Sequence, residues 1–577
     1  MFQQMYLCSS NPRRYFHQRF NEDDCMPTIP LSRSLLKSRI FRRAILCTLL
    51  LLTFSSASYA QFRMRMVNPP GSLIMHVSAK KILHFYVSLP DDLHEGKLTV
   101  NVFPYDSDGK PTRAPLATYR KTISSAQSGS VIDVGFTLSR AGLFRVDATL
   151  ASQDGETLDQ TSSTLAVVTR RDDVGPSDAG VVTHFAQGGA APSVLLPLVK
   201  QAGFSWIRDE LYWEAIEKRP GVFDFPRRFN TYLAASARLG ISPLVVLDYG
   251  NATAYPAMFS KSNFPQSPEA RKRFVDYVRA VVGRYRATVK NWELWNEPDF
   301  GKISYASYSA LLKDTFRAIK QISPDANVIS CGGGGSGGGP GGDCLVGVMN
   351  QGGLNDQDGF SVHPYMSPNT PEKGYKATGA PIDSVSIPTV WPYLGRLAAD
   401  HVKADGRTLQ IWVTETGWPL TRKVPGQDEA GQASNLVRTY LLSRRYGEVR
   451  VVFWYDFVDD GTDIDNIEHN FGLLHHDLTP KPAFVAASVL NTTVGKRGWG
   501  KALVDAENVK AYRYGTDDPV IVGWTVDGKE NTASISVPPG KYIQRDWQGV
   551  DTPLTISAQS FDWRVGPLPR YLIPDRR

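Results

Sequence analysis

The alternation of apolar and polar residues first indicates a β-sandwich near the N-terminus. Between about residues 72 and 169, the two kinds of residue alternate in short runs, as in residues 82–87, 97–103 and 131–134. Turn-forming pairs such as Asp154-Gly155 separate these runs. About seven short strands in roughly 100 residues predict a sandwich of immunoglobulin type. We place this domain at residues 61–172.

The next region, residues 178–493, changes to apolar strand-like runs that alternate with longer helical stretches. Short apolar strands that are each followed by a helix are typical of parallel strands joined by crossovers, so this order predicts an α/β fold. About eight such units favour a closed (β/α)8 barrel, a TIM barrel, over an open sheet. The strand candidates are residues 180–185, 205–209, 243–248, 291–295, 327–331, 359–365, 410–415 and 450–455. The helical candidates include residues 268–285, 305–322, 390–402 and 430–446.

The tail, residues 497–577, returns to short strand-like runs, for example residues 520–526, 533–537 and 554–556. This pattern predicts a second, small β domain packed on the barrel. The complete prediction is therefore a TIM barrel between an N-terminal immunoglobulin-like β-sandwich and a small C-terminal β domain.

The first 60 residues have the pattern of a secretory signal. Basic Arg39, Arg42 and Arg43 precede an apolar run at residues 44–54, and small residues then lead to Gln61. The run of 11 residues is shorter than the roughly 20 that a membrane-spanning helix needs, so we expect cleavage and no stable membrane span. Starting at Met26 would give a signal of ordinary length, with residues 1–25 untranslated or dispensable. The mature protein is expected to be secreted or periplasmic.

Charge and composition narrow the class of partner. The chain is 42% hydrophobic and 21% charged, which is typical of a soluble globular protein. The net charge is +7, but residues 1–60 contain eight Lys or Arg and three acids, so the remainder carries only +2. A nearly neutral mature protein gives no electrostatic reason to expect a nucleic acid as partner.

Two cysteines remain once the signal is removed. Cys331 and Cys344 bracket a run with nine glycines, which cannot hold one shape unaided. In an oxidising compartment, a disulfide between them would close this loop and stabilise it by about 3 kcal/mol. Two unrelated reduced thiols are the alternative.

Two glutamates stand where a TIM barrel places its chemistry. Catalytic groups of such barrels lie at the carboxyl ends of the strands, where the βα loops build the pocket. Glu297 directly follows the fourth strand candidate, and Glu415 ends the seventh. Because the fourth and seventh strands face each other across the mouth, we expect the two carboxylates to face a common substrate.

The barrel resembles clan A of the glycoside hydrolases and is most similar to bacterial members near families 39 and 5. The similarity covers about residues 178–490. It rests on Trp295-Asn296-Glu297-Pro298 at strand four, His363-Pro364-Tyr365 at strand six, Glu415 at strand seven, Trp454 at strand eight, and Asn470-Phe471-Gly472-Leu473-Leu474 near the end of the barrel. A histidine commonly ends strand three in family 5, whereas Asp248-Tyr249 stand here.

The resemblance implies a retaining glycosidase that needs neither a cofactor nor a metal. Glu297 would be the acid/base and Glu415 the nucleophile of a double displacement on a β-linked polysaccharide or oligosaccharide. The supporting residues would divide the remaining work. Asn296 would bind the sugar 2-hydroxyl, Tyr365 would donate to Glu415, His363 would bind sugar or support the acid/base, Trp454 would form a stacking floor, and Arg208 would steady Glu415 or Asn296 or form a salt bridge within the barrel.

Other interpretations remain open at this point. The acidic run at residues 459–465 resembles a calcium loop, but its spacing does not match one, and His469, His475 and His476 lack the spacing of a zinc site. A barrel with weak activity that binds glycan or helps to assemble exopolysaccharide is one alternative function, and a transglycosylase is another. Among substrates, the flanking domains favour bacterial exopolysaccharide over a β-xyloside or a plant polysaccharide.

Overall fold

The structure is a computed structural model that describes residues 63–77, 80–260, 262–299, 301, 303–333, 343–377 and 382–576. The predicted signal lies outside these residues, as does most of the glycine run after Cys331. None of the helices in these ranges has the length and apolar character needed to cross a membrane.

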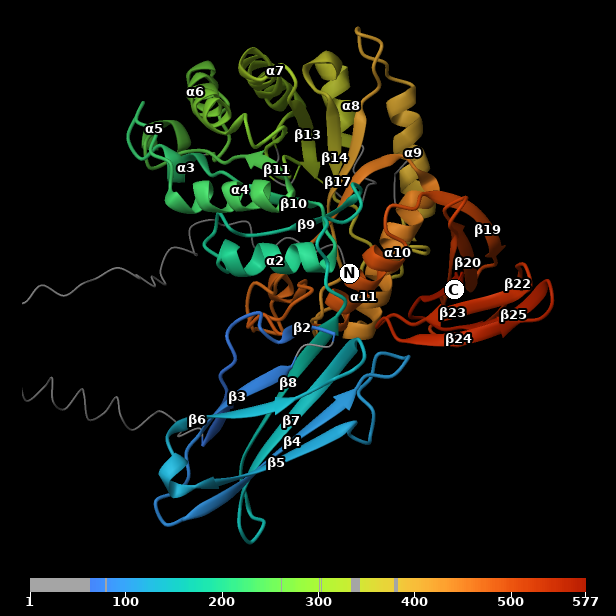
Figure 1. Cartoon of the computed structure of the whole chain (residues 1–577). Coiled ribbons are helices and arrows are strands. Elements are labelled where there is room, and N and C mark those ends of the chain that lie inside the picture. Colours follow the sequence, from blue (N-terminus) through green and yellow to red (C-terminus); the bar gives the residue numbers. More distant parts are fainter. Residues whose placement is uncertain are drawn as a thin grey trace, which may run out of the picture.

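The first described region is a β-sandwich (Figure 1). Among the described residues, one sheet has the order β1-β3-β6 and the other the order β2-β8-β7-β4-β5. Leu83 and Phe85 from the first sheet pack against Leu98 and Val100 from the second, and all four are fully buried. The strands are β1 (Met64–Met66), β2 (Ile74–His76), β3 (Lys81–Val87), β4 (Glu95–Pro104), β5 (Ala117–Ser124), β6 (Ser130–Phe136), β7 (Gly142–Ser152) and β8 (Thr157–Val168), with a short 3-10 helix, η3 (Ser125–Gln127).

A closed barrel of parallel strands follows, and the predicted fold class is confirmed. The barrel order within the described chain is β9-β10-β11-β12-β13-β14-β17-β18, with β18 pairing back to β9. The barrel strands are β9 (Ala179–Val182), β10 (Trp206–Glu210), β11 (Ser242–Leu247), β12 (Asn291–Leu294), β13 (Asn327–Gly333), β14 (Gly359–Val362), β17 (Gln410–Thr416) and β18 (Val449–Trp454).

Helices surround this barrel, as crossover connections require. They are α2 (Pro192–Ala202), α3 (Trp213–Ile216), α4 (Arg227–Leu239), α5 (Pro256–Phe259), α6 (Pro268–Tyr285), α7 (Tyr305–Ile322), α8 (Asp343–Asn350), α9 (Ile387–Ala399), α10 (Glu429–Tyr446) and α11 (Pro482–Thr493). Loops between them carry η4 (Gly353–Asp356), η5 (Ile467–Asn470) and a small hairpin of β15 (Tyr375–Lys376) and β16 (Ser384–Val385).

Side chains fill the lower part of the barrel, so the chemistry is confined to its mouth. Trp206 and Trp412 meet edge to face inside it, with ring centroids 5.4 Å apart, and Phe453 stacks beside Trp412. Leu244 and Ile329 belong to the same buried cluster. The alternate residues of each strand point outward and pack against the helices, as a period of two requires.

The C-terminal region is a β domain that packs against α10 (Figure 1). Its described strands form one sheet of order β19-β20-β21-β26-β23-β24 and a second pair, β22-β25. Tyr514 donates to the carbonyl of Leu441 in α10. The strands are β19 (Trp499–Asp505), β20 (Val509–Tyr514), β21 (Val520–Thr525), β22 (Asn531–Ser536), β23 (Gly540–Arg545), β24 (Asp551–Ile556), β25 (Ser560–Val565) and β26 (Arg570–Pro574).

This last domain also reaches the first one. The side chain of Gln548 accepts from the Leu143 amide at 3.1 Å and donates to the Tyr105 carbonyl at 2.9 Å. The Trp547 indole donates to the carbonyl of Asp106. The sandwich is therefore fastened by side chains that lie more than 400 positions later in the chain.

Candidate active site

The predicted catalytic glutamates meet at the mouth of the barrel. Glu297 follows β12, and Glu415 lies near the end of β17. One carboxylate oxygen of each, together with a ring nitrogen of His363, lie within 4.8 Å of one another. The structure thus brings these three side chains together from strands four, six and seven.

Glu415 is held in one position by two donors. Arg208 Nη1 lies 2.7 Å from one carboxylate oxygen, and the Tyr365 hydroxyl donates to the other at 2.8 Å. Burial by itself raises the pKa of Glu415, but His363, Arg208 and the bond from Tyr365 outweigh it and leave this pKa below its ordinary value. The site therefore favours an ionised Glu415.

Glu297 stands on a strained turn and is more open. Trp295 and Glu297 have φ angles of 66° and 49°, in the left-handed region that costs a residue with a side chain roughly 1–3 kcal/mol. The Glu297 amide donates to the Gly332 carbonyl at 2.5 Å, which ties this turn to β13. The Glu297 side chain is 31% exposed and has His363 Nδ1 at 3.1 Å.

Arg208 and Asn296 continue the network. Arg208 comes from β10 and is almost fully buried, and besides Glu415 it donates through Nη2 to Asn296 Oδ1 at 2.8 Å. The amide nitrogen of Asn296 then donates to the Tyr249 hydroxyl at 3.2 Å. The two roles considered for Arg208 near the catalytic pair, steadying Glu415 and steadying Asn296, are thus geometrically compatible.

His363 and Tyr365 lie beyond the strand in which they were expected. The predicted sixth strand runs to residue 365, whereas β14 ends at Val362. The Tyr365 amide donates to the His363 carbonyl at 3.0 Å, so the chain turns sharply between them. This turn, rather than the alternation of a strand, directs both side chains toward Glu415.

The prediction for Trp454 is wrong. Inward-facing side chains on β18 are Val451 and Phe453, so Trp454 points outward, where it is fully buried and stacks on Trp418 at 5.5 Å. A ring packed between strand and helix offers no face to a sugar. Tyr455, one position later, belongs to the inner side and lies edge to face with Tyr365.

Several polar groups of the mouth are not among the predicted site residues. Tyr455 donates to Glu468 at 3.2 Å, and burial, followed by the charge of Glu415, raises the pKa of Glu468 to about 7. His184 Nε2 lies 3.5 Å from Asp456 and 3.7 Å from Asp460. Burial lowers the pKa of His184, but Asp460 and then Asp456 outweigh it and raise it to about 10.

Asp456 is the most unusual member of this wall. It is fully buried, and no described residue forms a hydrogen bond of ordinary geometry with either carboxylate oxygen. Burial raises its pKa well above the ordinary value. In the acidic run at residues 459–465, Asp460 joins a cluster of described side chains, with His184 and Asp456, that could hold a cation. Asp459 is instead paired with Lys481, and Asp465 with Arg422.

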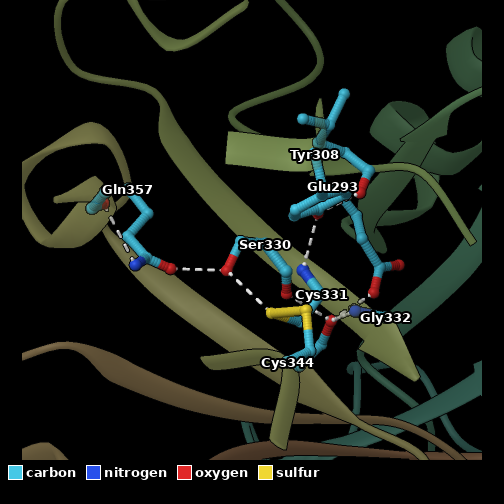
Figure 2. The surroundings of a disulfide bond; sticks show 10 residues. Glu293, Tyr308, Ser330, Cys331, Gly332, Cys344 and Gln357 are labelled. Carbon is cyan, nitrogen blue, oxygen red and sulfur yellow. Dashed lines mark hydrogen bonds between the residues drawn. A yellow bond between two sulfur atoms is a disulfide. The ribbon is translucent and has the colours of Figure 1, made fainter. Parts of the chain in front are cut away.

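A disulfide joins Cys331 and Cys344 beside the site, with Cα atoms 5.8 Å apart. Figure 2 shows it at the end of β13, next to Gly332 and Glu293. The Cys331 amide donates to the Tyr308 hydroxyl at 2.8 Å, and Tyr308 donates to the carbonyl of Leu294 at the end of β12. The crosslink therefore holds the segment that carries the Gly332 carbonyl, the acceptor for Glu297.

Comparisons with known proteins agree with this geometry. No protein-family model and no curated protein matches the chain. Among solved structures, a family 39 glycoside hydrolase from the gut symbiont Bacteroides cellulosilyticus WH2 is 34% identical, with a TM-score of 0.77 over 89% of this chain and 100% of that chain. A family 30 endoxylanase from Clostridium papyrosolvens C71 is 13% identical, with a TM-score of 0.47 over 70% of this chain and 97% of that chain.

The resemblance to clan A near family 39 is thus confirmed by a relative that matches the chain almost throughout. The predicted enzyme class is confirmed as well, because that relative is a glycoside hydrolase. From the extent and identity of this match, the chain belongs to glycoside hydrolase family 39 and is a glycosidase that acts on carbohydrate.

Proposed function

We propose that the protein is a retaining hydrolase of β-linked glycans, with Glu297 as acid/base and Glu415 as nucleophile. The observation that carries this proposal is the approach of the two carboxylates, which have oxygens within 4.8 Å of each other. Retaining glycosidases hold their carboxyl groups about 5–5.5 Å apart, whereas inverting enzymes need about 6.5–9.5 Å to admit a water. The short separation supports direct attack by Glu415.

The two steps follow from the unequal surroundings of the pair. Ionised Glu415 attacks the anomeric carbon while Glu297 gives its proton to the departing glycosidic oxygen, forming a glycosyl-enzyme ester. Forming the ester removes the negative charge of Glu415. Glu297, now a carboxylate, takes a proton from water as the water attacks the same carbon, and Glu415 leaves. Two inversions at one carbon retain its configuration.

The remaining side chains suit the sugar of the cleaved bond. Asn296 would bind the 2-hydroxyl, an interaction that strengthens toward the transition state. Tyr365 and Arg208 keep Glu415 ionised and aligned. Asp456 and Glu468 would bind further hydroxyls, which would give buried Asp456 the hydrogen bonds of ordinary geometry that it lacks among the described residues.

The polymer and its location belong to the same proposal. We infer that the enzyme is exported and cleaves a polysaccharide internally, because a signal-like segment precedes it and β domains flank the barrel. Bacterial exopolysaccharide is the favoured class. N-terminal sequencing of the mature protein should begin at Gln61, and a retained N-terminus in the cytoplasm would contradict export.

The central experiment replaces each glutamate by its amide. Glu297→Gln and Glu415→Gln should each reduce sugar release from a cleavable polysaccharide at least about 10⁴-fold while the melting temperature is kept. Exposed Glu507 in the C-terminal domain provides the matched control, and Glu507→Gln should leave activity unchanged. Full activity in either active-site variant would refute the assignment.

Proton NMR of the first products tests the stereochemistry. A retaining enzyme acting on a β-linkage releases the β-anomer first, and mutarotation then follows. Initial release of the α-anomer would show inversion and would overturn the proposed double displacement.

A further inference from the structure

Glu293 is a fully buried carboxylate on β12, four residues before Glu297. It receives donors from three other barrel strands. Arg208 Nε on β10 lies 2.6 Å away, Ser361 on β14 donates at 2.6 Å, and Thr414 on β17 donates at 2.9 Å. All three neighbours donate to the Glu293 carboxylate, which acts as their common acceptor.

The first connection leads to the nucleophile. The guanidinium that donates to Glu293 through Nε also donates to Glu415 through Nη1 and to Asn296 through Nη2. The planar fork of an arginine fixes these directions relative to one another. Glu293 therefore orients the cation that keeps Glu415 ionised.

The second connection leads to the acid/base through a chain of protons. Thr414 has one hydroxyl proton, and it is given to Glu293 at 2.9 Å. The same oxygen lies 3.0 Å from His363 Nε2, and with its proton committed it can only accept. His363 Nε2 must therefore carry a hydrogen.

That assignment determines what faces Glu297. With the Nε2 hydrogen directed to Thr414, the other nitrogen, Nδ1, lies 3.1 Å from Glu297 and 3.4 Å from Glu415. Nδ1 then either carries the second proton of an imidazolium, whose charge lowers the pKa of Glu415, or presents a lone pair that needs a proton from a neighbouring carboxyl. Because Arg208 and Tyr365 favour ionised Glu415, the proton belongs between Nδ1 and Glu297.

A third connection fixes the backbone of Glu297. Ser361 accepts from the Gly332 amide at 2.7 Å, and the Gly332 carbonyl accepts from the Glu297 amide. Figure 2 shows Glu293 and Gly332 close together beside the disulfide. The space is tight, since a Cβ on Gly332 would lie 3.0 Å from the Glu293 carboxylate.

We propose that Glu293 is a positioning residue that assigns opposite protonation states to the two catalytic glutamates, through Arg208 to Glu415 and through Thr414 and His363 to Glu297. The inference rests on the proposed roles of Glu297 and Glu415. Glu293 touches neither of them within hydrogen-bonding distance, so its effect is transmitted by the side chains between.

The sharpest test uses Thr414, because its hydroxyl can be removed without changing the volume of the side chain. Thr414→Val should lower kcat at least about 10-fold with KM within about twofold, because proton delivery is affected and sugar contacts are not. Thr414→Ser keeps the hydroxyl and should recover kcat to within about threefold of wild type. Glu293→Gln should lower kcat at least about 100-fold, and the double variant Glu293→Gln/Thr414→Val should fall short of the product of the two effects.

A spectroscopic measurement separates this role from a merely structural one. Nitrogen-15 NMR of the histidine-labelled full chain, with His363→Gln to assign the signal, should show His363 protonated at Nε2 in wild type and in Thr414→Ser. In Thr414→Val the proton should shift toward Nδ1. This measurement needs no turnover and stands even if Glu293→Gln fails to fold.

The outcomes are distinct. A wild-type His363 that is neutral and protonated only at Nδ1 would overturn the inference, as would unchanged kcat in Thr414→Val. If Glu297→Gln and Glu415→Gln retain activity, the proposed function itself fails. If those two are inactive while Thr414→Val and Glu293→Gln are normal, only the inference about Glu293 fails.

Discussion

The ends of β12 and β17 carry the same kind of side chain in opposite surroundings. At the end of β17, Glu415 is 10% exposed and both of its oxygens receive donors, from Arg208 and Tyr365. After β12, Glu297 is 31% exposed and meets only His363 among the described side chains within hydrogen-bonding distance. Glu415 is thus immobilised by two donors, whereas Glu297 is more open to solvent and to substrate.

The backbone is strained around Glu297 and not at Glu415. Glu415 lies in β17, at an irregularity in its pairing with β18, and has no left-handed φ. Trp295 and Glu297 adopt left-handed conformations, and their amides are held by the carbonyls of Leu247 in β11 and Gly332 in β13. The proposed nucleophile is therefore fixed by its side-chain partners, and the proposed acid/base by its main chain. Substitutions around Glu415 and substitutions around Glu297 should therefore have different effects on stability and activity.

Replacing Arg208 should have the largest effect. Arg208→Met leaves Glu293 and Glu415 buried without their cation, so unfolding free energy should fall by about 3–5 kcal/mol. We expect kcat to fall at least about 10³-fold, because the preorganised charge at Glu415 is lost. Denaturant titration and steady-state kinetics measure both, with Arg227→Met, at an exposed position of α4, as control. Normal activity of Arg208→Met would contradict the role of Arg208 in holding Glu415.

Tyr365→Phe removes one donor to Glu415 and leaves Arg208 in place. The hydrogen bond favours the ionised carboxylate, so its loss should raise the pKa of Glu415. More of the nucleophile is then protonated at low pH, and the acid limb of the kcat/KM profile should move to higher pH. We expect kcat to fall about 10–100-fold. An unmoved acid limb, with Tyr446→Phe as control, would contradict this role.

Opening the disulfide probes the acid/base end instead. Cys331→Ala/Cys344→Ala should lower unfolding free energy by about 3 kcal/mol. Loosening the segment that carries the Gly332 carbonyl should misplace Glu297 and reduce kcat by about 10-fold. The acid limb that reports on Glu415 should stay in place. A shift of that acid limb would show that Glu297 and Glu415 are not positioned independently of each other.

Glu468→Gln should change how the stability of the fold depends on pH. The folded pKa of Glu468 is about 7, above its ordinary value of 4.5, so the folded state retains a proton that the unfolded chain releases. Wild type therefore loses stability as pH rises between these values, and the amide does not. The variant should melt higher than wild type at pH 8, by about 2–4 °C for each kcal/mol recovered, and equally at pH 4. If the variant and wild type melt at the same temperature at pH 8 as well as at pH 4, the raised pKa of Glu468 is contradicted.

Regular elements with a strong periodicity are the most predictable part of the molecule. The helices predicted at residues 268–285 and 305–322 coincide with α6 and α7, because serine caps and an amphipathic pattern define their ends. The predicted strand positions likewise agree with the barrel, and from them follows the position of Glu297 and Glu415 at the mouth. Strand order is a local signal that a single sequence contains.

The side chains that support Glu297 and Glu415 are harder to predict from the sequence. Successive side chains of a strand point to opposite faces, so placing β18 one residue out of register exchanges Trp454 and Tyr455 between the inside and the outside of the barrel. Asp456 and Glu468 come from a long loop whose path has no periodicity. Glu293 did leave a signal, because a charge within an apolar strand, with Trp292 and Leu294 on either side, is costly unless it is paired.

The contact that Trp547 and Gln548 make with the sandwich bears on how the protein is made. Residues 105, 106 and 143 leave the ribosome hundreds of residues before their partners exist. The first domain can form its sheets early, yet its edge toward the tail stays unfinished until synthesis is nearly complete. A chain interrupted after the barrel would therefore leave an imperfect first domain as well as a missing last one.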